Sequence, residues 1–204
     1  MSTEATALES NPYSPPQARV ADAPSDADAA LYIVAPWKFL VMMVGTLSLY
    51  SVYWFYKNWS LLNRRHQAYW PVPRAIFAVF FTHALFDHID DRLRRNAPSF
   101  AWSPRALATV YVVCALVRGV GSRIPAAVVD TGVMTLFNLS LLIPMFYALY
   151  RAQRAINVAE NDPQGTRNNS LTLANIAWLV LGVLWIALVA VGLFMILSGR
   201  QRVA

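Results

Sequence analysis

One stretch of the chain, THALFDHIDDRLRR, contains the side-chain types that metal binding or acid–base catalysis uses. On a helix, His83, Asp87, Asp90 and Asp91 fall at i, i+4, i+7 and i+8, so an imidazole and three carboxylates share one face. Such a face could hold a divalent cation, and His83, Asp87 and Asp91 are the metal candidates. The spacing differs from the H-E-x-x-H pattern of zinc proteases, and Asp90 with Arg94 also fits an ordinary i,i+4 ion pair. We therefore favour a solvated helix face and expect no cofactor.

A second group of polar residues lies inside apolar runs. Arg118 and Asp130 each lie six residues from Ile124 in the turn GSRIP, so an antiparallel hairpin would bring them to similar depth. Because an intramembrane charge needs a partner or water, we expect a structural ion pair or, alternatively, part of a proton or substrate path. Thr135 and Asn138 follow Asp130 in the second helix of this hairpin and add polar groups to one of its faces. Such groups more commonly hydrogen-bond to a neighbouring helix.

These residues lie in or beside apolar segments close to the ~20 residues that a helix needs to cross a bilayer. The sequence predicts an all-α polytopic membrane protein with four transmembrane helices, at about 37–56, 106–121, 126–150 and 171–198. An amphipathic helix over about 74–95, at the interface or partly inserted, is added because its apolar half is too short to span. Five spans are the alternative, which the positive-inside rule disfavours because the basic residues would then divide almost evenly.

The composition agrees with a membrane protein. The 204 residues are 57% apolar and only 14% charged, against ~25% charged in ordinary soluble proteins. The net charge of +6 comes mostly from segments beside predicted spans, so anionic lipid headgroups explain it better than nucleic acid does. Cys114 is the only cysteine, so an intrachain disulfide is excluded and a structural zinc site is disfavoured.

The first predicted span, WKFLVMMVGTLSLYSVYWFYKNW, ends in aromatic residues followed by basic ones. This pattern is typical of a helix that leaves the bilayer on its cytoplasmic side, and it places both chain termini outside. The residues predicted to anchor to headgroups are Tyr53, Trp54, Tyr56, Lys57, Trp59, Arg64 and Arg65.

The chain divides into one membrane domain and two tails. Residues 1–30 are rich in Ala, Ser, Asp, Glu and Pro, which predicts a disordered tail. Residues 31–199 form the membrane domain, and residues 200–204 form a short basic tail.

Several segments resemble a family. KFLVMMVGTLSLYSVYWFYKNW, PRAIFAVFF with HALF, QRAIN and LANIAWLVLGVLW are similar to small bacterial inner-membrane proteins of the DUF4234 type, a domain of unknown function. The resemblance covers most of the chain from Lys38 to about Gly192. It implies a bacterial cytoplasmic membrane and about four helices, and it brings no catalytic residues.

Function is predicted only as a class. No glycine-rich phosphate loop, nucleophile elbow or kinase signature occurs. We expect a non-enzymatic accessory, assembly or interaction component that contacts anionic lipids and, through its membrane helices, a protein partner or a second copy. One alternative is a small transporter or channel subunit that uses Arg118, Asp130 and Asn138. The other is a membrane-embedded enzyme or metal site at His83, Asp87 and Asp91.

Overall fold

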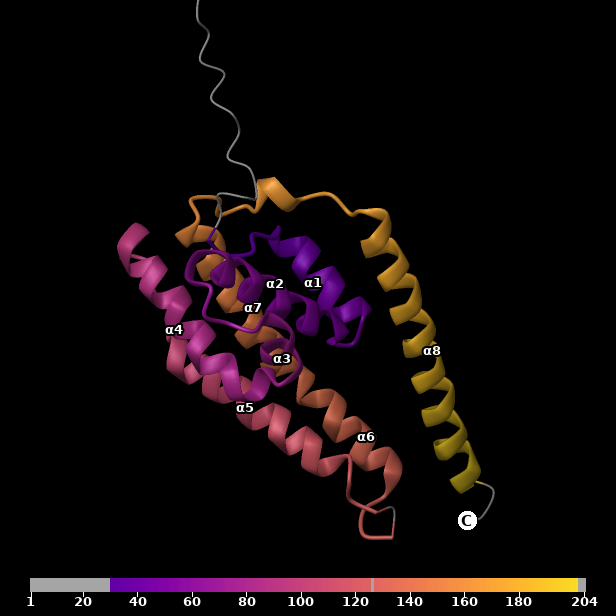
Figure 1. Ribbon diagram of the computed structural model, residues 1–204. Coiled ribbons are helices and arrows are strands. Elements are labelled where there is room, and N and C mark those ends of the chain that lie inside the picture. The colour runs from indigo at the N-terminus through magenta and orange to yellow at the C-terminus, as the bar shows by residue number, and fades with distance from the viewer. Residues whose placement is uncertain (1–29, 126, 202–204) are drawn as a thin grey trace, which may run out of the picture.

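The part of the chain that the computed structural model describes, residues 30–125 and 127–201, is helical (Figure 1). The all-α prediction is therefore confirmed. Of the predicted tails at 1–30 and 200–204, residues 1–29 and 202–204 lie outside the described residues, whereas α8 continues to Gln201. The elements are α1 (Pro36–Gly45), α2 (Leu49–His66), α3 (Pro71–Ile76), α4 (Ala78–Asn96), α5 (Pro104–Gly121), α6 (Thr131–Ser140), α7 (Leu142–Ala159), a 3₁₀ turn (Thr166–Asn168) and α8 (Leu173–Gln201).

Three stretches of the described chain are long and apolar enough to cross a bilayer: α5, the nearly continuous α6–α7 pair, and α8. They correspond to the last three predicted spans, although the middle one begins at Thr131 rather than at residue 126. The helix is interrupted at Leu141, between α6 and α7. Pro144 explains the interruption, because it lacks an N–H for the carbonyl four residues earlier and clashes with it.

The first predicted span, residues 37–56, is wrong as a single helix. α1 ends at Gly45, and α2 begins after a turn in which Leu47 and Ser48 have positive φ angles of 45° and 80°. The Thr46 hydroxyl stabilises this turn by donating to the Met42 carbonyl at 2.7 Å and accepting from the Tyr50 N–H at 3.0 Å. The apolar run is therefore two helices.

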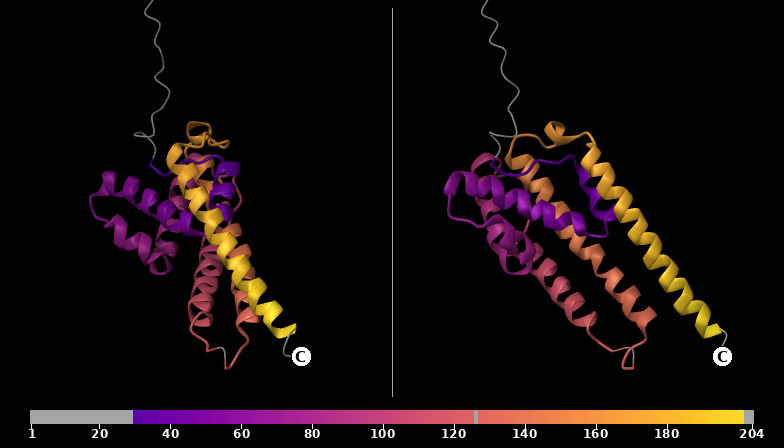
Figure 2. Two further views of the ribbon diagram at one scale, coloured as in Figure 1. Left: turned by 90° about the vertical axis from the view of Figure 1, so that its right-hand side faces the viewer. Right: turned by 45° about the vertical axis from the view of Figure 1, so that its right-hand side comes forward.

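α1 and α2 form a hairpin that returns toward its starting point (Figure 2). Tyr32, which precedes α1, packs edge-on against Tyr53 of α2 with ring centroids 6.0 Å apart. The Tyr32 N–H also donates to the Asn58 side-chain oxygen at 3.1 Å. α1 has 10 residues and is about 15 Å long, roughly half the thickness of a bilayer's hydrocarbon core. At this length α1 does not cross a bilayer by itself.

α7 is the centre of the helix packing. Ala148, Ala152, Ala155 and Ala159 form a stripe at helical spacing that is fully buried. Small side chains let neighbouring helices approach closely, and α1, α4 and α5 all pack on α7. Large buried side chains from those helices and from α2 fill the core, among them Phe39, Met42, Trp54, Phe55, Leu85, Phe86 and Ile89.

The predicted amphipathic helix over 74–95 is two helices, α3 and α4, which meet at Phe77. α4 buries Thr82, Leu85, Phe86, Ile89 and Leu93, which recur at the spacing of one helix face. Its polar residues lie on the other side and toward its C-terminal end, as an amphipathic helix requires.

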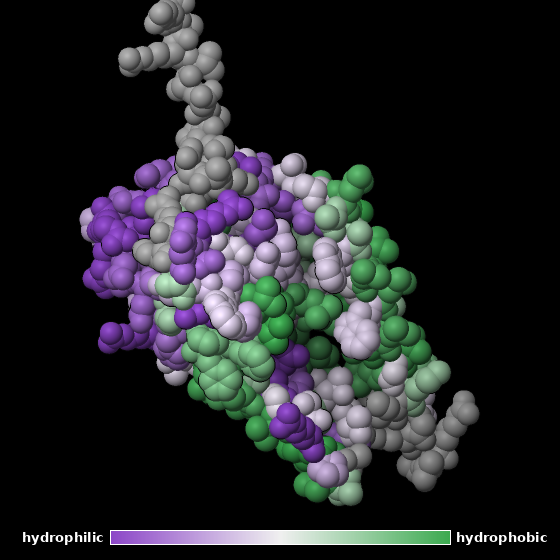
Figure 3. All heavy atoms as spheres, in the orientation of Figure 1, coloured by the Kyte–Doolittle hydropathy of each residue, from purple (hydrophilic) through white to green (hydrophobic). Residues whose placement is uncertain are grey.

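α8 stands apart from the other helices (Figure 1). It begins with a reciprocal cap, in which the Thr172 N–H donates to the Asn175 side-chain oxygen at 3.1 Å and the Asn175 N–H donates to the Thr172 hydroxyl at 3.3 Å. Its closest approach to α1 is at Gly182, where an added Cβ would lie 1.9 Å from the Gly45 carbonyl oxygen. Most of its remaining surface is exposed and hydrophobic (Figure 3).

Candidate functional site

We call the end of the bundle where α7 ends and α1 begins the inner end. It contains a buried network of hydrogen-bonded side-chain amides. Gln153 accepts a hydrogen bond from the Trp54 indole N–H at 2.6 Å and donates to the Asn157 side-chain oxygen at 2.7 Å. Asn157 in turn donates to the Val34 carbonyl at 2.8 Å. All three side chains are fully buried. The network therefore fixes the segment before α1 against α2 and α7, which is a structural role.

The loop between α7 and α8 joins the same end. Lys38 is 2% exposed, and its ammonium group donates to the Asn168 side-chain oxygen at 2.6 Å and to the Ser170 carbonyl at 2.8 Å. Asp162 accepts from the N–H groups of Thr166 and Arg167 at 2.9 and 3.0 Å. Burial raises the pKa of the Asp162 carboxyl, but these hydrogen bonds to its charged form outweigh burial, so the pKa is lowered overall.

The predicted headgroup-anchoring residues do not act as one group. Trp54 and Trp59 are fully buried, so their prediction as membrane anchors is wrong. They lie on the face of α2 that packs into the core. Aromatic residues at the end of an apolar segment do not by themselves show which face of the helix is buried. Arg64 is exposed, and the side chain of Arg65 lies outside the described part of the structure.

Tyr53, Tyr56 and Lys57 lie toward the other face of α2. The two tyrosines are exposed, at 40% and 39%. The Lys57 ammonium lies 5.8 Å from the centre of the Tyr53 ring and 5.9 Å from that of Tyr32, within the range of cation–π attraction. This face of α2 borders a cavity.

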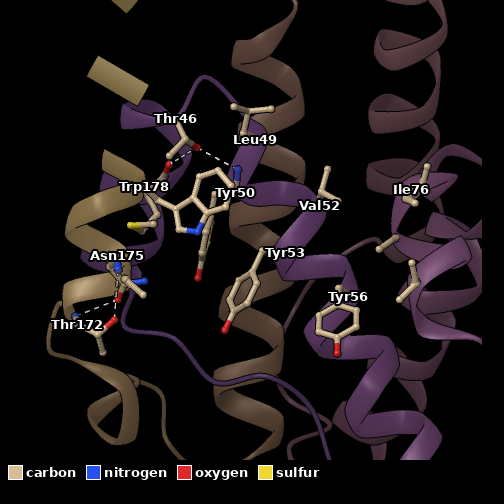
Figure 4. A pocket seen from close by; sticks show the side chains of 14 residues that line it. Thr46, Leu49, Tyr50, Val52, Tyr53, Tyr56, Ile76, Thr172, Asn175 and Trp178 are labelled. Atoms are coloured by element: carbon tan, nitrogen blue, oxygen red, sulfur yellow. Dashed lines mark hydrogen bonds between the residues drawn. The ribbon is translucent and has the colours of Figure 1, made fainter. Parts of the chain in front are cut away.

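We call this cavity the tyrosine pocket. It has a volume of about 570 Å³ and lies between α1, α2, α3 and the first turns of α8. In Figure 4 the rings of Tyr50, Tyr53 and Tyr56 follow one another along α2 with their hydroxyls pointing the same way, while Asn175 and Trp178 come from α8. The remaining lining is mostly aliphatic, and the described lining contains no Asp, Glu, Lys, Arg, His or Cys.

The polar groups of the tyrosine pocket are few and neutral. The Tyr50 hydroxyl is buried and lies next to the Tyr32 hydroxyl. The hydroxyls of Tyr53 and Tyr56 and the Asn175 amide add donors and acceptors. A mostly apolar cavity with a few converging polar groups is typical of a small-molecule site. The described lining contains no nucleophile paired with a base.

A second cavity, the arginine pocket, has a volume of about 630 Å³ and lies between α5, α6, α7 and α8. It brings together three of the four predicted intramembrane polar residues, Arg118, Thr135 and Asn138. Asp130 is not part of its lining. The Asp130 carboxylate instead caps the N-terminus of α6 by accepting from the Val133 N–H at 2.9 Å. The expected ion pair between Arg118 and Asp130 is not formed.

The predicted metal face on α4 does not assemble. The His83 ring lies 3.1 Å from the Thr109 hydroxyl, at hydrogen-bond distance, whereas Asp87 and Asp91 border a shallow depression that also contains arginines. Among the described residues, no group of three His, Cys, Asp or Glu side chains could hold a metal ion together. Asp90 accepts from Arg94 at 2.7 Å, which is the solvated i,i+4 pair that the spacing predicts.

Comparison with protein-family models, curated proteins and solved structures finds no match to the chain. The resemblance to DUF4234-type proteins thus stays a prediction. The tyrosine pocket is the site that sequence reasoning missed. Its signal was the spacing of Tyr50, Tyr53 and Tyr56 at i, i+3 and i+6, which places three hydroxyls along one helix face.

Proposed function

We propose that the chain is a polytopic protein of the bacterial cytoplasmic membrane and a non-enzymatic binding component. Its ligand is a mostly apolar molecule with a small hydrogen-bonding head, held in the tyrosine pocket. A protein partner or a second copy can join it through the exposed side of α8, as the sequence already suggested.

The proposed topology has three spans, α5, α6–α7 and α8, and a re-entrant hairpin, α1–α2. The clustering of basic residues supports this topology, because the inner end is strongly positive and therefore cytoplasmic. Hydrophilic surface gathers there, and hydrophobic surface covers α8 (Figure 3). Arg123 lies at the opposite end, in the α5–α6 turn. The basic residues toward the inner end are Lys57, Arg92, Arg94, Arg95, Arg105, Arg151, Arg154 and Arg167.

In this topology the segment before α1 lies on the cytoplasmic side, opposite to the side first expected. The Ala30 N–H donates to the Glu160 carboxylate at 3.2 Å, and the Ala35 N–H donates to the Asn168 carbonyl at 3.2 Å. Both contacts tie the chain before α1 to the loop between α7 and α8. Membrane insertion then requires no transfer of this segment across the bilayer.

The observation that carries the binding function is the tyrosine pocket itself, an apolar cavity of about 570 Å³ whose few polar groups include the hydroxyls of Tyr53 and Tyr56. These hydroxyls can hydrogen-bond to an ester, carbonyl or hydroxyl group of a ligand. The aliphatic lining suits an acyl or other hydrocarbon chain. Because the cavity borders α8, which is exposed on most sides, such a ligand can enter from the bilayer.

A photocrosslinking experiment tests this function. The full chain in nanodiscs is irradiated with a monoacylglycerol that carries a diazirine in its acyl chain, and the labelled residues are mapped by mass spectrometry. We expect label on the tyrosine pocket. Ala174→Trp should fill the pocket from α8 and reduce labelling there about tenfold, since steric exclusion removes most of the contact.

Ala177→Trp is the matched control, because Ala177 is exposed on α8 and does not line the pocket. It should leave the labelling unchanged. Equal labelling of Ala174→Trp, Ala177→Trp and the unchanged chain would show that the probe marks only the lipid-exposed surface, and would contradict the proposal.

A further inference from the structure

The arginine pocket contains two polar atoms that the described protein does not satisfy. The Arg118 Nε and the Asn138 side-chain oxygen are both buried and have no hydrogen-bond partner among the described residues. Both residues line the same cavity of about 630 Å³. The wall of the cavity therefore contains a cationic side chain and a neutral amide.

The neighbouring polar groups that the structure describes do not hydrogen-bond to the Arg118 Nε or to the Asn138 side-chain oxygen. The Asn138 amide nitrogen donates to the Met134 carbonyl at 2.9 Å, and the Thr135 hydroxyl donates to the Thr131 carbonyl at 2.7 Å. These bonds hold the two side chains and leave their oxygens able to accept. Gly121 lies beside the Asn138 amide, since an added Cβ would lie 3.4 Å from its oxygen, an ordinary van der Waals distance.

The charge of Arg118 has no carboxylate to balance it at this site. The described lining contains no Asp or Glu, and the Asp130 carboxylate is engaged at the start of α6. An uncompensated cation within a membrane-spanning helix is costly and is usually paired or hydrated. A guanidinium offers a fork of N–H donors that matches the oxygens of a phosphate group.

We propose that the arginine pocket binds a phosphate-bearing anion. Arg118 donates to the phosphate oxygens, and the Asn138 oxygen accepts from a hydroxyl of the same ligand. The anion is either the headgroup of an anionic phospholipid, with its chains along α8 at Trp185 and Val189, or a free phosphate compound. This site is separate from the tyrosine pocket and does not depend on the function proposed there.

Native mass spectrometry of the full chain tests the inference. The protein in a neutral detergent is titrated with phosphatidylglycerol, with phosphatidylcholine of the same acyl chains, and with inorganic phosphate. We expect retention of phosphatidylglycerol over phosphatidylcholine, and a loss of about tenfold in that preference for Arg118→Gln, because the charge-assisted bonds are removed.

Arg123→Gln is the matched control, since Arg123 is exposed, lies five residues further on and does not line the pocket. It removes the same charge and should preserve the preference. Asn138→Leu should weaken phosphatidylglycerol by a smaller factor than Arg118→Gln and leave inorganic phosphate unaffected. Arg118→Lys keeps the charge without the fork, so it should retain part of the preference and serves if Arg118→Gln fails to fold.

The lipid titrations and the inorganic phosphate titration distinguish a lipid headgroup from a free phosphate compound. If inorganic phosphate binds in an Arg118-dependent way and the lipids show no such preference, the ligand is a soluble phosphate. If Arg118→Gln and Arg123→Gln weaken lipid binding equally, the effect is general surface charge and the inference is wrong. It is also wrong if neither phosphatidylglycerol nor phosphate binding changes when Arg118 is replaced by Gln or by Lys.

Discussion

At the inner end of the bundle, the amides of Gln153 and Asn157 are fully buried and bonded to backbone and side-chain groups from three segments. In the arginine pocket, by contrast, the Arg118 Nε and the Asn138 oxygen are buried with no partner in the described chain. A satisfied network specifies one packing of the chain, whereas unsatisfied atoms beside a cavity mark a place for something else. The same residue type, asparagine, thus has a structural role in one region and a proposed binding role in the other.

The largest expected effect separates the two asparagines. Asn157→Ala should lower the free energy of unfolding by about 3 kcal/mol or more, because it leaves Val34 and Gln153 with buried unpaired groups. Asn138→Ala should cost less than about 1 kcal/mol, since it removes only one bond, within its own helix. Thermal unfolding in detergent, followed by size-exclusion chromatography, measures both. Equal losses would contradict the distinction between the regions.

The second largest expected effect is on the stability that the contact between α8 and α1 contributes. Gly182→Ala should destabilise the protein by about 1–3 kcal/mol, because the new Cβ overlaps the Gly45 carbonyl oxygen and α8 must shift. Gly192→Ala is the control on the same helix. Nothing lies within 4 Å of its added Cβ, so better helix propensity should stabilise it by up to about 1 kcal/mol. The same unfolding assay decides, and a stabilised Gly182→Ala would show that the helix contact is absent.

The smallest effect is a pH dependence confined to the inner end. Because the pKa of Asp162 is lowered in the folded protein, its stabilisation is present above the ordinary carboxyl pKa and is lost as the pH falls through the lowered value. The protection of the Thr166 and Arg167 amides against hydrogen exchange, taken relative to the intrinsic exchange rate at each pH, should therefore fall in acid by an amount equivalent to about 1 kcal/mol. Asp162→Asn should remove most of this pH dependence.

Asp87→Asn, on the exposed side of α4, changes the same charge without touching that loop. It should leave the exchange of these two amides and its pH dependence unchanged. A loss of protection in acid that persists in Asp162→Asn would assign the effect to another group.

Local patterns predicted the elements that depend on local physics. The long apolar runs predicted α5 and α8 within a few residues, because length and hydropathy largely decide a membrane-spanning helix, whereas the predicted middle span, 126–150, stops well before α7 ends at Ala159. The spacing of Asp90 and Arg94 likewise predicted their contact, since residues four apart meet on any helix. The buried face of α4 followed from its periodicity.

The hairpin α1–α2 could not be predicted in this way. Residues 37–56 carry a single charge, Lys38, and the two residues with positive φ in the turn, Leu47 and Ser48, are neither proline nor glycine, although Gly45 lies two residues earlier. Distant partners stabilise the fold there. Asn157 and Asn168 are more than 100 residues from the segment before α1 that they bind. The same error placed Trp54 at a headgroup boundary, although its indole bonds to Gln153 within the core.

The separation of the hairpin from its partners also bears on how the protein is made. α1 and α2 leave the ribosome before any of the side chains that hold them, since Gln153, Asn157 and Asn168 are translated much later. Until then, the Trp54 indole N–H and the Lys38 ammonium, which later donate to Gln153 and Asn168, would face lipid or water without these partners. The first helices synthesised are therefore among the last to reach their final places, and a chain truncated before α7 would leave them without a site.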